Sequence, residues 1–446
     1  MKKTILLITA ALLCLQLGAQ QRDGFEEIRK EPLKAGNVFY MYNHDIPAHA
    51  PAPRGYKPVY VSHYGRHGAR SHSSEKDFDN IIGILSAARD RGLLTETGAR
   101  CLADYEKVYP IIHGRSSDLT GHGVTQQHRI AHNMYRNYRR VFRGDKKIDA
   151  NSTTVPRVVL TMNAFCEQMH SDNPKLRIEQ QASEATMPVL SVFCKSHPDV
   201  KPTDEGYNNK NAYWQEGFQQ YRRDNIHPEL FFSNLMTDWS LVKEFGDPYE
   251  IEFGFYETFT NLQCNDKVSQ DMVQYIPIEE LCCLWDTVNY RFYCSKGPDT
   301  LYQKGRQWAF AWTTMKDILD KTDQDLASGE YAARLRFGHD IIVMSLFVLL
   351  DVDGYNKAVG DYSELRTSWF SYDFPMSLNL QFILYRNREG DTLVRIMYNE
   401  RDIELPIENS GTRYYYRWDD FKSYANSRID LAHNIIATTQ APPKKH

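Results

Sequence analysis

The sequence predicts an α/β fold in which a mostly parallel sheet, flanked by helices, carries an inserted and mainly helical cap domain. Three places along the chain share one pattern: a short apolar strand runs into a turn, and the turn opens a helix. They lie near residues 58–68, 147–156 and 335–350. Strands and helices that alternate in this way are typical of an α/β sheet, which binds its ligands at the carboxyl ends of its strands.

In the first junction, residues 59–61 form a short apolar run, which Gly65 and Gly68 interrupt. Ser74, with Asp77 three residues later, predicts the N-cap of the helix that follows. The apolar face of this helix has helical spacing and consists of Phe78, Ile81, Ile82, Leu85 and Ala88.

At the second junction, residues 147–151 are weakly strand-like, and Pro156 suits the first turn of a helix, where its missing amide hydrogen costs nothing. At the third, residues 335–337 (LRF) lead into residues 338–340 (GHD), and the apolar run 341–350 follows. Each junction therefore brings polar side chains to the point where a strand ends and a helix begins.

Between the second and third junctions the pattern is mostly helical, and the clearest helices are residues 231–245 and 302–319. We interpret residues 166–324 as the cap, and residues 21–165 and 325–446 as the two parts of the α/β core. Beyond the third junction, two strand patterns flank a turn and predict a β-hairpin over residues 378–385, 388–391 and 392–398.

The composition is that of an ordinary globular protein, with 42% hydrophobic and 25% charged residues among 446. The formal charge is −4 and the pI is about 6.4, so bulk charge gives no reason to expect nucleic acid or a membrane surface as a partner. Any function in binding anions must therefore depend on a local cluster of positive charge.

The amino terminus has the pattern of a targeting signal. Two lysines precede an apolar run over residues 5–17, which is too short to span a bilayer. Ala19 suits the position before a cleavage site, so we interpret residues 1–20 as a signal peptide and rank lipidation at Cys14 second. The mature chain is expected to be a periplasmic or secreted monomer without a membrane span.

Seven cysteines remain outside this signal, and an exported protein can form disulfides. The odd number leaves at least one unpaired, and the adjacent Cys282 and Cys283 are poorly placed to bridge each other. No CxxC pair or regular spacing indicates zinc. We interpret these cysteines as structural and leave their pairing open: Cys101, Cys166, Cys194, Cys264, Cys282, Cys283 and Cys294.

The densest group of chemically useful residues stands at the first junction, where residues 64–70 read YGRHGAR. A site for phosphoryl transfer must hold three charged oxygens while a nucleophile attacks in line. Arginine suits the oxygens because its planar guanidinium donates two hydrogen bonds at once and stays charged. Histidine suits the nucleophile because a backbone carbonyl can hold one ring nitrogen while the other stays free. This segment therefore favours His67 as a nucleophile between Arg66 and Arg70.

The segment resembles the signature of the histidine phosphatase superfamily, in the branch of histidine acid phosphatases, phytases and multiple inositol polyphosphate phosphatases. Three further segments are similar to that branch and follow in its order. Residues 119–128 (LTGHGVTQQH) resemble its helix opening. Residues 157–165 resemble the segment that supplies a third phosphate-binding arginine, here Arg157. Residues 335–340 (LRFGHD) resemble its distal His-Asp motif.

The resemblance implies a role for each matching residue and implies no cofactor. His67 accepts the phosphoryl group and becomes a phosphohistidine. Asp340 protonates the departing alkoxide and then activates the water that releases phosphate. Four groups surround the phosphate of a small phosphorylated substrate: Arg66, Arg70, Arg157 and protonated His339.

Two positions differ from the usual pattern of the branch. Residues 71–72 (SH) stand where x-Pro usually follows the arginine–histidine string. Residues 341–342 (II) follow Asp340, whereas acid phosphatases and phytases usually read His-Asp-Thr-Asn and the multiple inositol polyphosphate phosphatases His-Ala-Glu. Residues 336–339 and 344–350 are closer to the last group. These differences leave the substrate open.

Metal sites are the other interpretation of the histidines. His128 and His132 have the i, i+4 spacing of zinc ligands on a helix, but the glutamate of an HExxH motif is missing. Residues 351–354 (DVDG) match only a fragment of a calcium loop. We therefore expect no metal.

Together these residues predict an exported phosphomonoesterase that works through a phosphohistidine, with inositol polyphosphates as the leading substrate class. A general acid or sugar phosphatase of the same branch is the first alternative. A phosphoglycerate mutase-like enzyme would use the same arginine–histidine string, but export argues against it. A non-catalytic protein that binds phosphorylated ligands is the remote alternative, and the intact nucleophile and carboxylate argue against it.

Overall fold

The computed structural model describes residues 22–191, 194, 196–199, 213–300 and 306–439. The predicted signal peptide, with Cys14, lies outside the described residues and stays a prediction. Among the residues that are described, no helix has the length and the apolar character that crossing a membrane requires. All seven cysteines that follow the predicted signal are described, and each of them is free.

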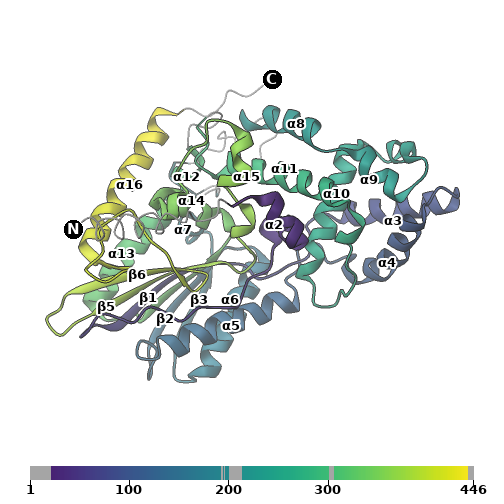
Figure 1. The fold of residues 1–446 in the computed structure, drawn as a ribbon. Helices are drawn as coiled ribbons and strands as arrows, with labels where there is room; N and C mark the ends of the chain where they lie inside the picture. Colours follow the sequence, from purple (N-terminus) through teal and green to yellow (C-terminus); the bar gives the residue numbers. More distant parts are fainter. Residues whose placement is uncertain (1–21, 192–193, 195, 200–212, 301–305, 440–446) are drawn as a thin grey trace, which may run out of the picture.

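Eight strands form one sheet in the order β3-β2-β4-β1-β5-β6-β7, with β8 paired to β6 (Figure 1). The four strands β3, β2, β4 and β1 are parallel neighbours, while β5 to β8 pair in the antiparallel sense. The predicted α/β class is confirmed, with a mixed sheet. Its strands are β1 (Lys57–Arg66), β2 (Lys147–Ser152), β3 (Arg177–Ala182), β4 (Ala333–Gly338), β5 (Asn379–Arg386), β6 (Thr392–Tyr398), β7 (Arg401–Asp402) and β8 (Tyr415–Arg417).

Helices cover both faces of this sheet, because the side chains of each strand alternate between two apolar cores. Val61 packs in the core beneath α5 and α6, whereas Tyr60 and Tyr64 face the core on the other side. Figure 1 shows the two layers. The helices of the layers are α5 (Gly121–Asn137), α6 (Pro156–Asp172), α7 (Met187–Leu190), α12 (Arg306–Ala309), α13 (Trp312–Ser328), α14 (Asp340–Leu350) and α16 (Trp418–Thr438).

The remaining helices include a cluster beside the sheet, in which α3 and α4 pack against α9 and α10 (Figure 1). The division into residues 21–165, 166–324 and 325–446 stays a prediction, since this cluster takes α3 and α4 from the first segment and the sheet takes β3 from the second. These helices are α2 (Gly24–Lys30), α3 (Glu75–Asp90), α4 (Glu96–Ile112), α8 (Tyr213–Asn225), α9 (Pro228–Leu235), α10 (Pro248–Asn261), α11 (Ile278–Lys296) and α15 (Leu365–Ser368). Short 3-10 turns are η1 (Pro32–Phe39), η2 (Trp239–Glu244), η3 (Leu262–Cys264), η4 (Val273–Tyr275), η5 (Val352–Gly354), η6 (Tyr362–Glu364) and η7 (Ser371–Asp373).

The prediction of one helix over residues 231–245 is wrong. Helix α9 ends at Leu235, and its last carbonyl accepts a hydrogen bond from the Thr95 amide at 3.0 Å. Met236 then forms a β-bridge with Leu94, so its backbone pairs with the connection between α3 and α4 instead of continuing the helix. The chain coils again only at η2, where the Asp238 carboxylate accepts from the Ser240 amide.

The prediction of a helix over residues 302–319 also needs correction. Residues 302–305 lie outside the described residues, α12 ends at Ala309, and a new helix, α13, begins at Trp312. Helix α13 extends to Ser328 and stops where Gly329 takes a left-handed conformation, with φ 68°. By contrast, β5 and β6 confirm the predicted hairpin.

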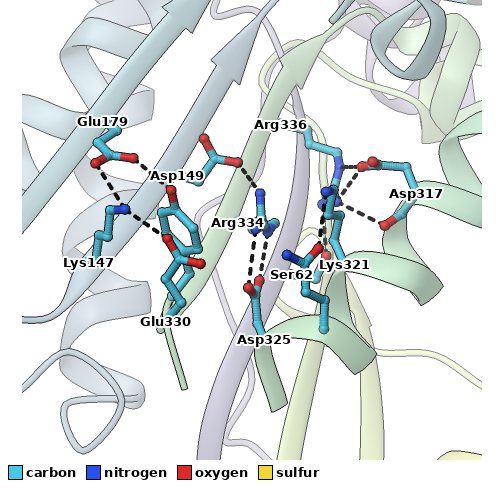
Figure 2. Close-up of polar contacts among 12 residues, drawn as sticks. Ser62, Lys147, Asp149, Glu179, Asp317, Lys321, Asp325, Glu330, Arg334 and Arg336 are labelled. Carbon is cyan, nitrogen blue, oxygen red and sulfur yellow. Dashed lines mark hydrogen bonds and ion pairs between the residues drawn. The ribbon is translucent and has the colours of Figure 1, made fainter. Parts of the chain in front are cut away.

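Polar side chains of the parallel strands are paired with charges from α13 and from neighbouring strands (Figure 2). The Arg334 guanidinium donates to Asp325 at 2.6 Å and to Asp149 at 2.5 Å. The Arg336 guanidinium donates to Asp317 at 2.8 Å. Because an unpaired buried charge would be strongly destabilising, these pairs fix α13 against the sheet.

Candidate active site

His67 follows β1 directly and is held by backbone contacts on three sides. Its amide donates to the Gly338 carbonyl at 3.0 Å, and its carbonyl accepts from the Ser377 amide at 3.2 Å. Its ring Nδ1 lies 2.9 Å from the Gly68 carbonyl oxygen, which can only accept, so Nδ1 carries the proton and Nε2 keeps its lone pair. Only 2% of His67 is exposed. The ring is therefore fixed with Nε2 as the free nucleophilic nitrogen.

Helices α5 and α6 hold the loop that carries His67. The Gly68 amide donates to the Thr161 hydroxyl, and the Ala69 amide donates to the Gln126 side-chain carbonyl, both at 3.1 Å. The backbone also approaches α5 closely, since a Cβ at Gly68 would lie 2.6 Å from the Gly123 carbonyl oxygen. The segments 119–128 and 157–165, which the sequence singled out, thus meet residues 67–69 in the fold.

Three arginines surround this histidine, each on a different part of the chain. Arg66 ends β1, Arg70 lies in the loop after it, and Arg157 lies in the first turn of α6. The Nε atom of each guanidinium is buried and has no hydrogen-bond partner among the described residues. Burial and the positive charges of Arg157 and Arg66 lower the pKa of Arg70 to about 10. Because the three guanidinium groups repel one another, an anion bound between them would be stabilising.

His339 and Asp340 stand at the start of α14, directly after β4. The His339 ring lies 5.5 Å from the His67 ring between centroids, and its amide donates to the Tyr64 hydroxyl at 3.2 Å. An Asp340 carboxylate oxygen lies 3.5 Å from the Arg66 guanidinium. The structure therefore brings all six predicted residues together at the carboxyl ends of β1 and β4 and at the start of α6.

The positive charges of the three arginines affect the protonation of His339 and Asp340. Burial, reinforced by the charge of Arg157, lowers the pKa of His339 to about 4. Burial acts to raise the pKa of Asp340, but the surrounding positive charges, of which Arg66 has the largest effect, together outweigh it and lower that pKa to about 2. Without a bound anion, His339 is neutral near pH 7 and not protonated as the resemblance implies, while Asp340 is ionised. Both pKa values must rise when a phosphate enters.

Lys296 is a further basic side chain at this site, and no local sequence pattern indicates it. It ends α11, is fully buried, and its ammonium lies 3.7 Å from the centre of the Phe292 ring. Burial lowers the pKa of Lys296 well below its ordinary value, and the Asp340 carboxylate opposes that shift. No motif surrounds Lys296 in the sequence, because only the packing of α11 brings it near Asp340.

A comparison with known families matches residues 65–399 to the histidine phosphatase superfamily (branch 2). This span exceeds half of the chain and contains all seven residues of the cluster. The chain belongs to this family. It is therefore a phosphomonoesterase. No curated protein matches the sequence of this phosphatase.

Solved structures of inositol phosphate phosphatases share the fold of this phosphatase. The Bifidobacterium longum multiple inositol polyphosphate phosphatase in complex with phosphate has a TM-score of 0.73 at 16% identity, covering 89% of this chain and 98% of that chain. Its complex with inositol hexasulfate has a TM-score of 0.71 at 16% identity, covering 87% and 97%. The phytase from D. castellii has a TM-score of 0.66 at 17% identity, covering 89% and 85%.

The histidines that the sequence suggested as metal ligands have other partners in the phosphatase. His128 lies 3.4 Å from Glu167, and His132 lies 2.9 Å from Asp172. Among the described residues, one group brings three potential ligand atoms within 4.8 Å of one another. This group consists of His227, which stands at the N-cap of α9, and of Glu280 and Cys283 on α11.

Replacing any one of the three arginines of the phosphatase should slow catalysis. Arg66→Ala, Arg70→Ala and Arg157→Ala are each expected to lower kcat/KM on the order of 10²-fold or more, by analogy with lost oxyanion donors. Steady-state kinetics with p-nitrophenyl phosphate would measure this. Arg129→Ala, which removes an exposed arginine from α5, is the matched control and should have no effect. Full activity of Arg157→Ala would remove α6 from the proposed site.

The phosphatase should remain active well below the pH at which an ordinary histidine protonates. Burial and the charges of Arg66 and Arg157 lower the pKa of His67 well below 6.5. The neutral nucleophile is therefore lost only when the pH falls through this lower pKa. With a pKa of 6.5, its neutral fraction would fall about sixteenfold from pH 6.5 to pH 5. We expect kcat/KM for p-nitrophenyl phosphate, which reports the free enzyme, to change less than about threefold, after correction for substrate ionisation. A sixteenfold loss would contradict the shifted pKa.

Proposed function

We propose that the protein is an exported phosphomonoesterase in which His67 accepts the phosphoryl group of inositol polyphosphates. One observation carries the proposal: three buried guanidinium Nε–H groups without partners surround a histidine whose Nδ1 proton is fixed on a carbonyl. Unpartnered buried donors are costly, and an anion with three charged oxygens would satisfy them. The fixed tautomer directs the free Nε2 toward such an anion.

The first half of the reaction transfers the phosphoryl group to His67. Nε2 attacks phosphorus, the bond between phosphorus and the leaving oxygen breaks, and its electron pair stays on that oxygen. Asp340 gives this alkoxide its proton. In the free protein the pKa of Asp340 is about 2, so Asp340 must gain its proton when substrate binds. The phosphate dianion raises the pKa of Asp340, because it offsets the positive charge of Arg66 and itself repels the Asp340 carboxylate.

The second half regenerates the free histidine. A water attacks phosphorus, its proton passes to the Asp340 carboxylate, and the bond between phosphorus and Nε2 breaks. Together the two halves convert a phosphomonoester and water into an alcohol and inorganic phosphate. The same bound anion raises the pKa of His339, so that its ring donates to the phosphate as a cation.

Two features support inositol polyphosphates as the substrate class. The site gathers four basic side chains, Arg66, Arg70, Arg157 and the cap residue Lys296, which is more than one phosphate requires. The solved enzymes with the same fold include a multiple inositol polyphosphate phosphatase and a phytase. Export rests on the lysines and the apolar run near the amino terminus. We propose that the mature protein is a monomer that is periplasmic or secreted.

Timed product analysis tests the substrate class. Inositol hexakisphosphate and glucose 1-phosphate are incubated separately with the full mature chain, and the products are separated by anion exchange. We expect stepwise loss of phosphate from the inositol ring, with kcat/KM at least about tenfold above that for glucose 1-phosphate. Equal or faster hydrolysis of glucose 1-phosphate would instead favour a general or sugar phosphatase with the same catalytic histidine.

A further inference from the structure

A groove of about 1200 Å³ lies at the opposite end of the parallel strands from His67. Its floor includes the start of β1 at residues 58–60 and residues 331–332 just before β4. Its walls come from the connection between α5 and β2, the connection between α6 and β3, and the end of β5. The catalytic residues follow the carboxyl ends of β1 and β4, so they do not line this groove.

Positive charge gathers on several walls of this groove. Six cationic side chains line it, and all but one of them are exposed to solvent. The formal charge of the whole chain is −4, so this concentration is local. The six residues are Arg139, Arg140, Arg143, Lys146, Lys175 and Arg386.

The carboxylates near the groove are already paired, and Figure 2 shows Asp325 and Glu330 with their partners. Asp325 is the one acidic residue in the described lining, and it accepts hydrogen bonds from Arg334 at 2.6 Å and from the Tyr60 hydroxyl at 3.0 Å. Glu330 accepts from Lys147 at 3.0 Å. None of the four arginines and two lysines of the groove forms an ion pair with a carboxylate in the described part of the chain.

Hydrogen bonds to the backbone join the segments that form the walls of the groove. The side-chain NH2 group of the buried Asn173 donates to the Phe142 carbonyl at 2.7 Å and to the Gly144 carbonyl at 2.9 Å. Its side-chain oxygen accepts from the Lys175 amide at 3.1 Å. The Arg177 amide donates to the Lys146 carbonyl at 2.9 Å. The segments that carry Arg143, Lys146 and Lys175 are thus joined before any ligand binds.

We propose that this groove binds a compact polyanion, a small molecule that carries several phosphate or sulfate groups. Its volume is in the range of small-molecule sites, and cations on several walls can surround one ligand. A site for a membrane surface would instead present its cations on one flat face of the protein. Arginine binds phosphate and sulfate oxygens with two parallel hydrogen bonds. This proposal does not rest on the role of His67.

Calorimetric titration with inositol hexasulfate tests the groove, since its sulfate esters are not phosphomonoesters. The inhibition constant of hexasulfate against p-nitrophenyl phosphate reports the catalytic site alone. Wild type should bind hexasulfate at the groove as well, and this second binding should weaken as salt is added. The variant Arg139→Ser/Arg143→Ser/Lys175→Ser should weaken the second binding at least about tenfold. Its inhibition constant, its kcat and its Tm should not change.

A matched triple variant controls for the loss of three positive charges. Arg100→Ser/Arg223→Ser/Lys243→Ser removes two exposed arginines and one exposed lysine from α4, α8 and η2, none of which lines the groove. It should keep both binding events. The proposal is overturned if the groove variant keeps the second binding, or if the control variant loses it equally. Binding of wild type to vesicles of an anionic lipid without any second binding of hexasulfate would also overturn it. A failure of hexasulfate to inhibit would bear on the catalytic site only.

Discussion

His67→Ala is expected to reduce kcat/KM by at least about 10⁴-fold for every substrate, which is about 5.5 kcal/mol of transition-state stabilisation. Alanine cannot form a covalent intermediate, and a water in the space left by the ring would lack the fixed orientation that the Gly68 carbonyl gives to the imidazole. The ring lies within an arrangement that α5, α6 and β4 hold in place by backbone contacts, so its removal should leave the loop intact. Release of inorganic phosphate from p-nitrophenyl phosphate and from inositol hexakisphosphate is the measurement.

His132→Ala is the matched control, because His132 is exposed on α5 and, among the described residues, its ring forms a hydrogen bond or ion pair with Asp172 alone. It should keep full activity. The Tm of both variants should lie close to that of wild type. Turnover by His67→Ala within roughly tenfold of wild type would correspond to little more than 1 kcal/mol and would exclude the covalent role.

Asp340→Asn should distinguish substrates by their leaving groups. An inositol alkoxide needs a proton as it departs, so its hydrolysis should slow by about 10²–10⁴-fold. The p-nitrophenolate group needs little protonation, and its transfer to His67 should slow much less. Asparagine keeps the shape of the side chain and can still approach Arg66. Rapid-mixing kinetics on the two substrates would measure the phosphorylation step for each.

Asp351→Asn is a control at the other end of the same helix. Asp351 caps α14 in a left-handed conformation, with φ 50°, which asparagine adopts readily. Asp351→Asn should leave the rate of hydrolysis of both substrates unchanged. If Asp340→Asn slowed both substrates equally, Asp340 would be structural, and the proton would have to come from another group near the leaving oxygen.

Much of the site could be predicted because its signals are local. The string around His67, the proline that begins α6 and the Gly-His-Asp turn each sit where a strand ends and a helix begins, and the structure has β1, β2 and β4 at those places. Parallel neighbours end at one edge of a sheet, so the three strings had to meet. The departure at Ile341 also has a physical reading, since that side chain packs against the apolar core and leaves Asp340 as the carboxylate beside Arg66.

Other features depend on packing between distant segments, which local patterns do not report. Lys296 comes near enough to Asp340 for the two charges to influence each other only because α11 ends there. Thr161 accepts a hydrogen bond from the Gly68 amide only because α6 packs beside the loop that follows β1. The break after Leu235 arises from a β-bridge to the connection between α3 and α4. The apolar residues 308–312 show no break in the pattern where α12 ends and α13 begins, so the two helices look like one in the sequence.

A rapid alkaline quench would trap the covalent phosphohistidine at His67. Wild type is mixed with radiolabelled substrate, stopped within one turnover, digested and sequenced by mass spectrometry. We expect an alkali-stable, acid-labile phosphoryl group on the peptide that contains His67. It should form and disappear at rates that match turnover, and it should be absent from His67→Ala. Label on another residue, or turnover with no labelled histidine at any time point, would contradict the covalent role of His67.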